Sequence, residues 1–377
     1  MDVIRKLARA VRHPRRALRR LAGEAPREPV AAASPPDQDI AAAYEAVRQG
    51  MLLAQRERDE AWEILHRAKG GYEAQLKDYD DRLVEAHARL ATFSDADRQR
   101  LAHYEAMKRS NRLVELDFPV RPQVRFGHGK PPHRLLHERL SRDDAATRAT
   151  LESFLPLLPR LAEITLDPVA DASQPHWRNP AFPAFDAIAL YGLIATRRPR
   201  RVLEIGSGFS TKFARRAIRD HGLSTRIVSI DPEPRAEVDA ICDEVVRMPL
   251  EQAPMQLFRD LTAEDIVFFD GSHRAFQNSD ATVFFTEILP EVPPGTLVGI
   301  HDIFWPEDYP PAWLDWHFSE QYLLACWLLG GEALEVVLPV HHAELTPALM
   351  AVLDPFWAHP ALQGALHTGG GFFFERR

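Results

Sequence analysis

Cysteine is scarce in this chain, and its scarcity excludes two ways of stabilising a fold. The 377 residues include only two cysteines, Cys242 and Cys326, which are too few for a disulfide framework or a thiolate zinc site. A chain that does not use disulfides is typical of a reducing compartment. We therefore expect a cytoplasmic protein.

Long apolar runs and an excess of positive charge are also absent. No stretch of apolar residues in the sequence is long enough to span a bilayer, and a formal net charge of -8 gives no general attraction to nucleic acid. Hydrophobic residues make up 45% of the 377 positions, so the chain can form two domains and at least one sizeable core. We expect a small-molecule or glycan partner and no nucleic acid.

A third glycine is missing from the most informative segment, residues 202–211, which reads VLEIGSGFST. An apolar strand runs into a tight turn at Gly206 and Gly208, and a helix follows. Dinucleotide-binding turns have a further glycine where this chain has Thr211. A cofactor with an adenosine but no pyrophosphate fits better, although an ordinary strand-to-helix turn is the alternative.

Two acidic residues flank this turn in the pattern expected of an adenosine site. Glu204 stands two residues before the first glycine, and Asp231 ends the next apolar strand, residues 226–231. In doubly wound folds an acid at the tip of the second strand reaches the ribose hydroxyls.

The turn resembles that of class I S-adenosylmethionine-dependent methyltransferases, and in particular a bacterial subgroup with the motif E-x-G-S-G-x-S-T, similar to macrocin-type sugar O-methyltransferases. The resemblance covers residues 179–377 and implies an α/β fold: a doubly wound, Rossmann-like sheet, mostly parallel, with an antiparallel last strand. Residues 335–340 and 371–375 resemble the closing strands. The cofactor contacts that it implies are Glu204, Gly206, Ser207, Gly208, Ser210, Asp231 and Asp270.

Polar side chains end two later strands, residues 265–270 and 296–302, whose tips we expect to meet at one edge of the sheet. There Asp270, His301 and Asp302 could hold a divalent cation, magnesium or manganese. In macrocin-type and catechol-type enzymes, the resembling tips supply three oxygen ligands to magnesium. His301 departs from that pattern, because imidazole suits manganese, iron or zinc better. The alternative is that the two carboxylates cap helices and His301 only packs.

His273 follows Asp270 by three residues, and the resemblance implies that a histidine in this Asp-x-x-His arrangement is the general base. A sugar hydroxyl is a weak nucleophile, so a base must remove its proton as the methyl group transfers. A turn histidine bonded only to backbone is the alternative.

The expected function is thus O-methylation of a hydroxyl on a sugar or glycosylated product, with S-adenosylmethionine as the methyl donor. Two rivals remain open: another enzyme on the same fold, such as a hydroxylase-like relative, and a non-catalytic scaffold that keeps the cofactor fold.

Aromatic residues surround the expected site on both sides of the glycine turn. Phe182 and Phe185 are candidates for a lid over the cofactor or for a hydrophobic staple at a helix start. Helices are expected at 278–289 and 313–329. A later aromatic group, after the strand that ends at Asp302, could line an acceptor pocket or form core. Its members are Trp305, Tyr309, Trp313 and Trp316.

The N-terminal part has a different character. Residues 1–39 read as a basic amphipathic arm and a linker, and residues 1–22 either lie on an anionic membrane surface or form a solvated arm. Residues 40–117 have heptad-like apolar spacing, which predicts a long helix or helical pair that joins chains as a coiled coil, or else packs on the catalytic domain. Residues 118–178 form a connector with further helices over 135–161, and residues 179–377 form the methyltransferase domain.

Overall fold

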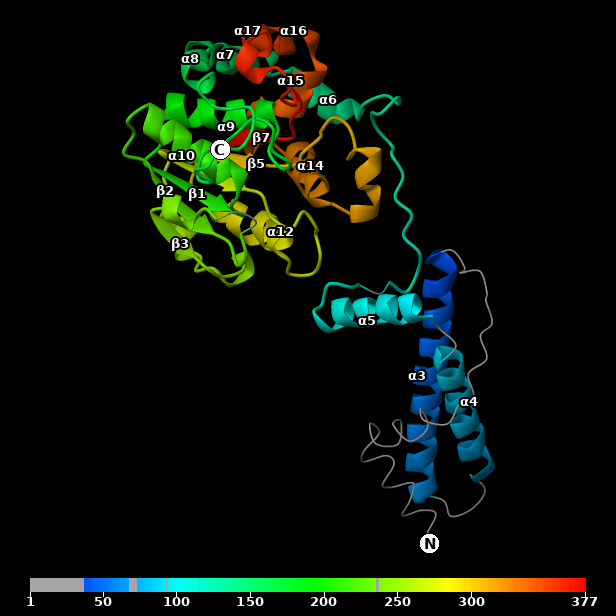
Figure 1. Cartoon of the computed structure of the whole chain (residues 1–377). Helices are drawn as coiled ribbons and strands as arrows, with labels where there is room; N and C mark the ends of the chain where they lie inside the picture. Colours follow the sequence, from blue (N-terminus) through cyan, green and yellow to red (C-terminus); the bar gives the residue numbers. More distant parts are fainter. Residues whose placement is uncertain (1–36, 68–72, 92–93, 115, 235–236) are drawn as a thin grey trace. The chain divides into compact units, whose positions relative to one another are not determined.

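The structure is a computed structural model of the chain, and it describes residues 37–67, 73–91, 94–114, 116–234 and 237–377. The chain forms two compact units, Met1–Pro119 and Val120–Arg377 (Figure 1). The predicted membrane contact of residues 1–22 lies outside the described residues. Within the described part, no helix is long and apolar enough to cross a membrane.

The first unit consists of helices. Helix α3 packs along α4, and Ala54 of α3 is buried. The start of α5 is fixed by a capping box, because the Asp97 amide donates to the Ser94 hydroxyl and the Asp97 carboxylate accepts from the Ser94 amide. The α3–α4 contact shows that a helical pair forms within one chain. A coiled coil between chains stays a prediction. The helices are α3 (Asp37–Arg67), α4 (Glu73–Ala91) and α5 (Asp95–Arg109).

The second unit is built on a seven-stranded sheet in the order β3-β2-β1-β4-β5-β7-β6. The first five strands are parallel, and β7 runs antiparallel to both of its neighbours. The predicted fold class, including the antiparallel closing pair, is thereby confirmed. The strands are β1 (Arg201–Ile205), β2 (Arg226–Ile230), β3 (Glu244–Val246), β4 (Asp265–Phe269), β5 (Leu297–Ile300), β6 (Leu334–Pro339) and β7 (Phe372–Arg376).

Both faces of the sheet are buried, which explains why its central strands are apolar at nearly every position. In β4, Ile266 and Phe268 face one core, while Val267 and Phe269 face the other. The first core is covered by α7 (Asp144–Glu152), α8 (Leu158–Leu161), α9 (Ala184–Arg197), α10 (Phe209–Asp220), α15 (Val340–Leu345), α16 (Pro347–Met350) and α17 (Asp354–Trp357). The second is covered by α6 (Arg134–Ser141), α11 (Gln256–Arg259), α12 (Asp280–Val283), α13 (Leu289–Glu291) and α14 (Glu320–Gly330).

The expected helix over 313–329 is wrong in its first part. A 3-10 segment, Pro311–Trp316, ends at His317, whose left-handed φ of 55° cannot continue a right-handed helix. Helix α14 starts anew at Glu320, so this residue occupies a first turn rather than a helix interior. The expected helix over 278–289 is present as a continuous helical run, in which the π-helical turn Phe284–Ile288 connects α12 directly to α13.

Candidate functional site

The glycine turn connects β1 to α10 at the carboxyl edge of the sheet, and Gly206 allows it to lie against the tip of β4. Gly206 has a φ of 77°, and a Cβ atom there would lie 1.8 Å from the Asp270 carbonyl oxygen. Only glycine satisfies both constraints. The Asp270 amide also donates to the Ile205 carbonyl at 2.8 Å, so the turn and the first predicted metal ligand are fixed together.

A cleft of about 800 Å³ opens above this turn. Nearly all residues predicted to contact the cofactor line it: Gly206, Ser207, Gly208, Ser210, Asp231 and Asp270. Other parts of its wall come from residues 180–182, Pro249–Glu251 and the loop after β4. The cleft thus lies outside the carboxyl ends of parallel strands, where open α/β sheets bind ligands.

Glu204 is the predicted cofactor contact that does not line the cleft. Its side chain is buried beneath the turn, and its Oε2 accepts a hydrogen bond from the Thr211 hydroxyl at 2.5 Å. Burial raises the pKa of Glu204 to about 7, although hydrogen bonds from Ser210 and Thr211 act against this shift. Glu204 therefore stabilises the turn from its buried side through a hydrogen bond to Thr211. Thr211 stands where a dinucleotide-binding turn has its third glycine.

Asp231 lines the cleft and is held there by hydrogen bonds. Its Oδ2 accepts from the Ser207 amide at 2.7 Å and from the Ser207 hydroxyl at 3.2 Å, and its Oδ1 accepts from the Glu233 amide at 2.8 Å. Each carboxylate oxygen retains lone-pair capacity for a further donor. The carboxylate is thus pre-oriented where the sequence predicted a ribose contact.

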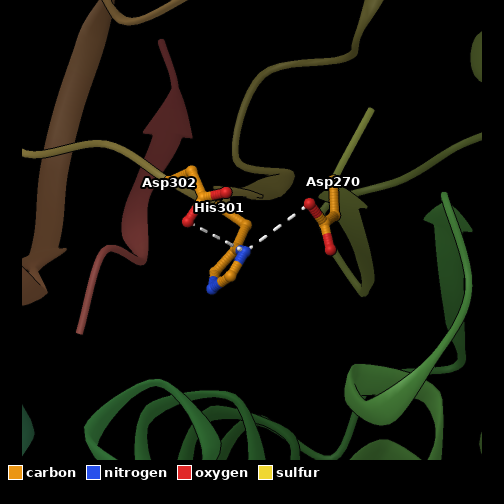
Figure 2. Close-up of side chains that lie close together, drawn as sticks. All are labelled: Asp270, His301 and Asp302. Atoms are coloured by element: carbon orange, nitrogen blue, oxygen red, sulfur yellow. Dashed lines mark ion pairs between the residues drawn. The ribbon is translucent and has the colours of Figure 1, made fainter. Parts of the chain in front are cut away.

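The three predicted metal ligands come together at the tips of β4 and β5 (Figure 2). One ligand atom from each of Asp270, His301 and Asp302 lies within 4.8 Å of the others. The Nδ1 atom of His301 lies 3.5 Å from a carboxylate oxygen of each aspartate, and it is buried with no hydrogen-bond partner. A buried nitrogen that faces two carboxylates in this way fits a site for a cation.

Asp186 orients the His301 ring, and sequence reasoning missed it. The buried Asp186 carboxylate accepts from the Gly370 and Gly371 amides at 2.9 and 2.7 Å, and its Oδ2 lies 3.0 Å from Nε2 of His301. Because an ionised carboxylate only accepts, Nε2 keeps its proton, so Nδ1 is the nitrogen that gains or loses a proton beside the aspartates. The only sequence signal was an aspartate in an otherwise apolar helix.

The electrostatics of the cluster also favour a positive charge. Burial alone would lower the pKa of His301, but the Asp302 and Asp270 carboxylates outweigh burial and raise that pKa well above its usual value. A proton on His301 therefore partly compensates the two carboxylates in the absence of any other cation. A divalent cation between the same groups would compete with that proton.

His273 lies beside this cluster and is almost completely buried. Its Nε2 lies 3.4 Å from Asp270 Oδ1 and 3.5 Å from Asp302 Oδ2, whereas its Nδ1 lies 2.5 Å from Glu320 Oε1. The alternative of a histidine bonded only to backbone does not describe this arrangement. Glu320 carried no sequence signal, because the expected continuous helix placed it in a helix interior.

The aromatic residues divide between core and surface. Trp305 and Tyr309 are buried and belong to the core, as does Phe185. Phe182 lines the cleft, and its ring centroid lies 5.1 Å from that of His301. Trp316 is 48% exposed and stacks on Trp313 at 5.0 Å.

Comparison with known proteins agrees with this geometry. A family described as methyltransferase domain matches residues 203–303, from β1 to the loop after β5. No curated protein matches the chain significantly. The match agrees with the methyltransferase domain predicted from the sequence. The use of S-adenosylmethionine and the likeness to the macrocin-type subgroup stay predictions.

Several solved structures are similar to this chain. The SAH-bound methyltransferase PaMTH1 of Podospora anserina is 15% identical over 51% of this chain and 77% of its own, with a TM-score of 0.31. The O-methyltransferase TomG of Streptomyces achromogenes is 20% identical over 50% and 77%, with a TM-score of 0.29. An O-methyltransferase of Bacillus cereus, in complex with SAH, is 16% identical over 61% and 91%, with a TM-score of 0.31.

The raised pKa of Glu204 predicts a pH-dependent stability. The pKa of Glu204 in the fold, about 7, exceeds the ordinary value of 4.5. Relative to high pH, protonation of Glu204 therefore favours the folded state; this contribution is complete below about pH 4.5 and is lost as the pH rises through 7. Glu204→Gln should therefore gain stability relative to the wild type between pH 5 and pH 8, by up to about 3 kcal/mol.

Denaturant unfolding followed by tryptophan fluorescence measures this difference, because Trp62 is the one tryptophan before residue 120. Glu264→Gln, at an exposed position, is the control. Equal stability differences at both pH values for Glu204→Gln would contradict the prediction.

Proposed function

We propose that this chain transfers a methyl group from S-adenosylmethionine to a hydroxyl of a sugar or glycosylated small molecule. The observation that carries the proposal is the position of Asp270. This residue lines the cleft, belongs to the candidate cation cluster and lies 3.4 Å from Nε2 of His273. Cofactor cleft, cation ligands and proton acceptor therefore meet at one side chain.

The glycine turn and Asp231 are suited to hold the cofactor. When bound, S-adenosylmethionine supplies an electrophilic methyl group on a sulfonium. The backbone at Gly206 and Gly208 allows close approach of a ligand, and the fixed Asp231 carboxylate can accept from ribose hydroxyls. Glu204 supports the turn without lining the cleft.

Asp270, His301 and Asp302 are suited to hold a divalent cation. When bound, such a cation would lower the pKa of an acceptor hydroxyl and orient it. One imidazole nitrogen with two carboxylate oxygens favours manganese over magnesium. The orientation of His301 by Asp186 supports this role, since Nδ1 of the ring already faces both carboxylates.

His273 is the proposed proton acceptor, and its charge state depends on the neighbouring carboxylates. Burial lowers the pKa of His273, but Glu320, Asp302 and Asp270 outweigh burial and raise the pKa to about 9. A cation bound to Asp270 and Asp302 would neutralise part of their charge and weaken their attraction for the His273 proton. The pKa of His273 would then fall, and Nε2 would lose its proton nearer neutral pH. The neutral base then has its lone pair on Nε2, the nitrogen that lies 3.4 Å from the cleft residue Asp270.

The acceptor class follows from the resemblance to sugar O-methyltransferases and from the aromatic surface beside His273. The Phe318 ring lies 4.6 Å from the His273 ring and 5.4 Å from Trp316. Half-exposed tryptophan presents a flat apolar face with a polar edge, which suits the ring of a sugar or an aromatic group.

The two rival functions make different demands on these residues. A non-catalytic scaffold has no need of buried, ionisable His273, His301 and Glu320, whose burial is costly. A hydroxylase-like enzyme would not release demethylated cofactor. Transfer of a labelled methyl group from S-adenosylmethionine to methyl glycosides distinguishes both rivals from the proposal.

Replacing His273 should separate catalysis from cofactor binding. His273→Ala and His273→Gln should lower the rate of methyl transfer by about 10² to 10⁴, the range for loss of a positioned base, yet bind S-adenosylmethionine as the wild type does. Asp231→Ala should do the reverse and weaken binding by about 1.5 to 3 kcal/mol. Isothermal calorimetry measures binding; a His273→Ala rate within tenfold of the wild type would exclude this base.

Cation binding should depend on the three-residue cluster and on pH. His301→Ala and Asp302→Asn should lose measurable affinity for manganese in calorimetry, whereas the exposed control Asp167→Asn should keep it. Because the pKa of His301 is raised, a proton competes with the cation, and affinity should increase as the pH rises. Full methyl transfer after exhaustive chelation would leave the cluster a packing feature.

The helical first unit is proposed to join chains. Ala54 is buried within the unit, but Leu53 on α3 and Val84 on α4 remain 50% and 60% exposed. Exposed apolar side chains on paired helices favour a partner helix. Sedimentation should show an oligomer that the double variant Leu53→Glu, Val84→Glu converts to monomer with unchanged helix content; a monomeric wild type would contradict this.

A further inference from the structure

Glu320 is a fully buried carboxylate with a single strong partner. Its Oε1 lies 2.5 Å from Nδ1 of His273, and its Oε2 is buried without a hydrogen-bond partner. A buried carboxylate is costly unless it is compensated, and an apolar side chain would fill this place in α14 more cheaply. His273 is the hydrogen-bond partner of this carboxylate, so the effect of Glu320 falls on the His273 ring.

The backbone around Glu320 fixes His273 as well. The Ser319 amide donates to the His273 carbonyl at 2.7 Å, the Ser319 hydroxyl accepts from the Ala275 amide at 2.9 Å, and the Arg274 side chain donates to the Trp316 carbonyl. These bonds join the loop after β4 to the start of α14. They also hold His273 at a φ of 63°, a left-handed conformation that a non-glycine residue keeps only when its surroundings enforce it.

The two ring nitrogens of His273 therefore face different environments. Nδ1 faces Glu320 in the interior, whereas Nε2 faces Asp270 and Asp302 at the cluster. An ionised carboxylate can only accept a hydrogen bond, and Glu320 at 2.5 Å is much nearer to the ring than the aspartates at 3.4 and 3.5 Å, so Glu320 selects the ring form with a proton on Nδ1. The lone pair of the neutral ring is then on Nε2, on the side of the cleft residue Asp270.

We propose that Glu320 is a positioning residue: its carboxylate accepts the Nδ1 proton of His273 and so directs the Nε2 lone pair toward the acceptor hydroxyl. This inference rests on the proposed role of His273 as proton acceptor. Glu320 itself neither lines the cleft nor belongs to the candidate cation cluster. The two partners are 47 residues apart in the sequence. They meet because α14 begins at Glu320, which places this residue in the first turn of the helix.

A purely structural tie between the loop and α14 makes a different prediction from a positioning role. Glu320→Gln keeps the volume of the side chain and a hydrogen bond to the ring, but it removes the charge that selects the proton position. Ser319→Ala weakens the tie, because it removes the bond to the Ala275 amide, and leaves the carboxylate in place. This pair of variants separates orientation from attachment.

The first readout is the imidazole itself, in the full chain without any ligand. With ¹⁵N-labelled histidine, the wild type should show a low-field Nδ1 proton for His273, which His273→Gln assigns by its disappearance. The signal should move to higher field in Glu320→Gln and stay in place in Ser319→Ala. An unchanged signal in Glu320→Gln would overturn the proposal.

The second readout is steady-state methyl transfer to whichever methyl glycoside is methylated. Glu320→Gln should lower kcat by at least about tenfold, the effect typical of losing a group that orients a functional histidine, with the acceptor KM nearly unchanged. Glu320→Asp should recover part of kcat, and Ser319→Ala should stay within about threefold of the wild type. A wild-type kcat in Glu320→Gln would overturn the proposal.

The double variant Glu320→Gln, His273→Gln separates this inference from the proposed function. If Glu320 acts through His273, the double variant should turn over no more slowly than His273→Gln alone. An additional loss in the double variant would assign Glu320 a separate structural role. A wild-type rate in His273→Gln would instead remove His273 as the proton acceptor, and the imidazole signal would then decide whether Glu320 still fixes that ring.

Discussion

Excess negative charge in a poorly solvated place is the constraint on which this site depends. Four carboxylates and two imidazoles lie at the carboxyl edge of the sheet, within a network of contacts no longer than 3.5 Å. Two protonated imidazoles would still leave an excess of carboxylate charge, and that excess favours further positive charge. The residues are Asp186, Asp270, His273, His301, Asp302 and Glu320.

The outer carboxylates of this network, Asp186 and Glu320, have partners at hydrogen-bond distance. Asp186, on α9, accepts from the backbone amides of Gly370 and Gly371 just before β7, in addition to its contact with His301. A Cβ atom on Gly369 would lie 2.5 Å from Asp186 Oδ1, so the glycines make room for this carboxylate besides turning the chain. Asp270 and Asp302 instead face histidine nitrogens at 3.4 to 3.5 Å, distances that suit charge attraction better than hydrogen bonding.

The parts that follow from strand tips could be predicted from the sequence. Parallel strands bring their carboxyl ends to one edge, so Asp231, Asp270 and His301 had to lie near the glycine turn once the strands were recognised. The relation between Gly206 and Asp270 is of the same kind. Local pattern and topology are sufficient for such residues.

Asp186 and Glu320 could not be predicted, because their roles depend on partners 115 and 47 residues away. Each lies in the first turn of an apolar helix, where an acidic residue is ordinarily explained by the helix dipole. Periodicity also concealed the break at His317, since the apolar spacing continues through it. Such a break depends on tertiary contacts of the loop rather than on residue spacing.

The charge constraint also couples the proposed binding events. A cofactor sulfonium, a divalent cation and protons on His273 and His301 all respond to the same carboxylates, so each added positive charge lowers the affinity of the others unless it takes their place. On the proposed function, His301 would exchange a proton on Nδ1 for a cation, because Asp186 occupies Nε2. His273 is fixed differently: Glu320 faces Nδ1, so the compensation of Asp270 and Asp302 changes the proton affinity of Nε2 without reorienting the ring. On the proposed function, the base is therefore made ready by charge compensation rather than by movement, which is consistent with its burial.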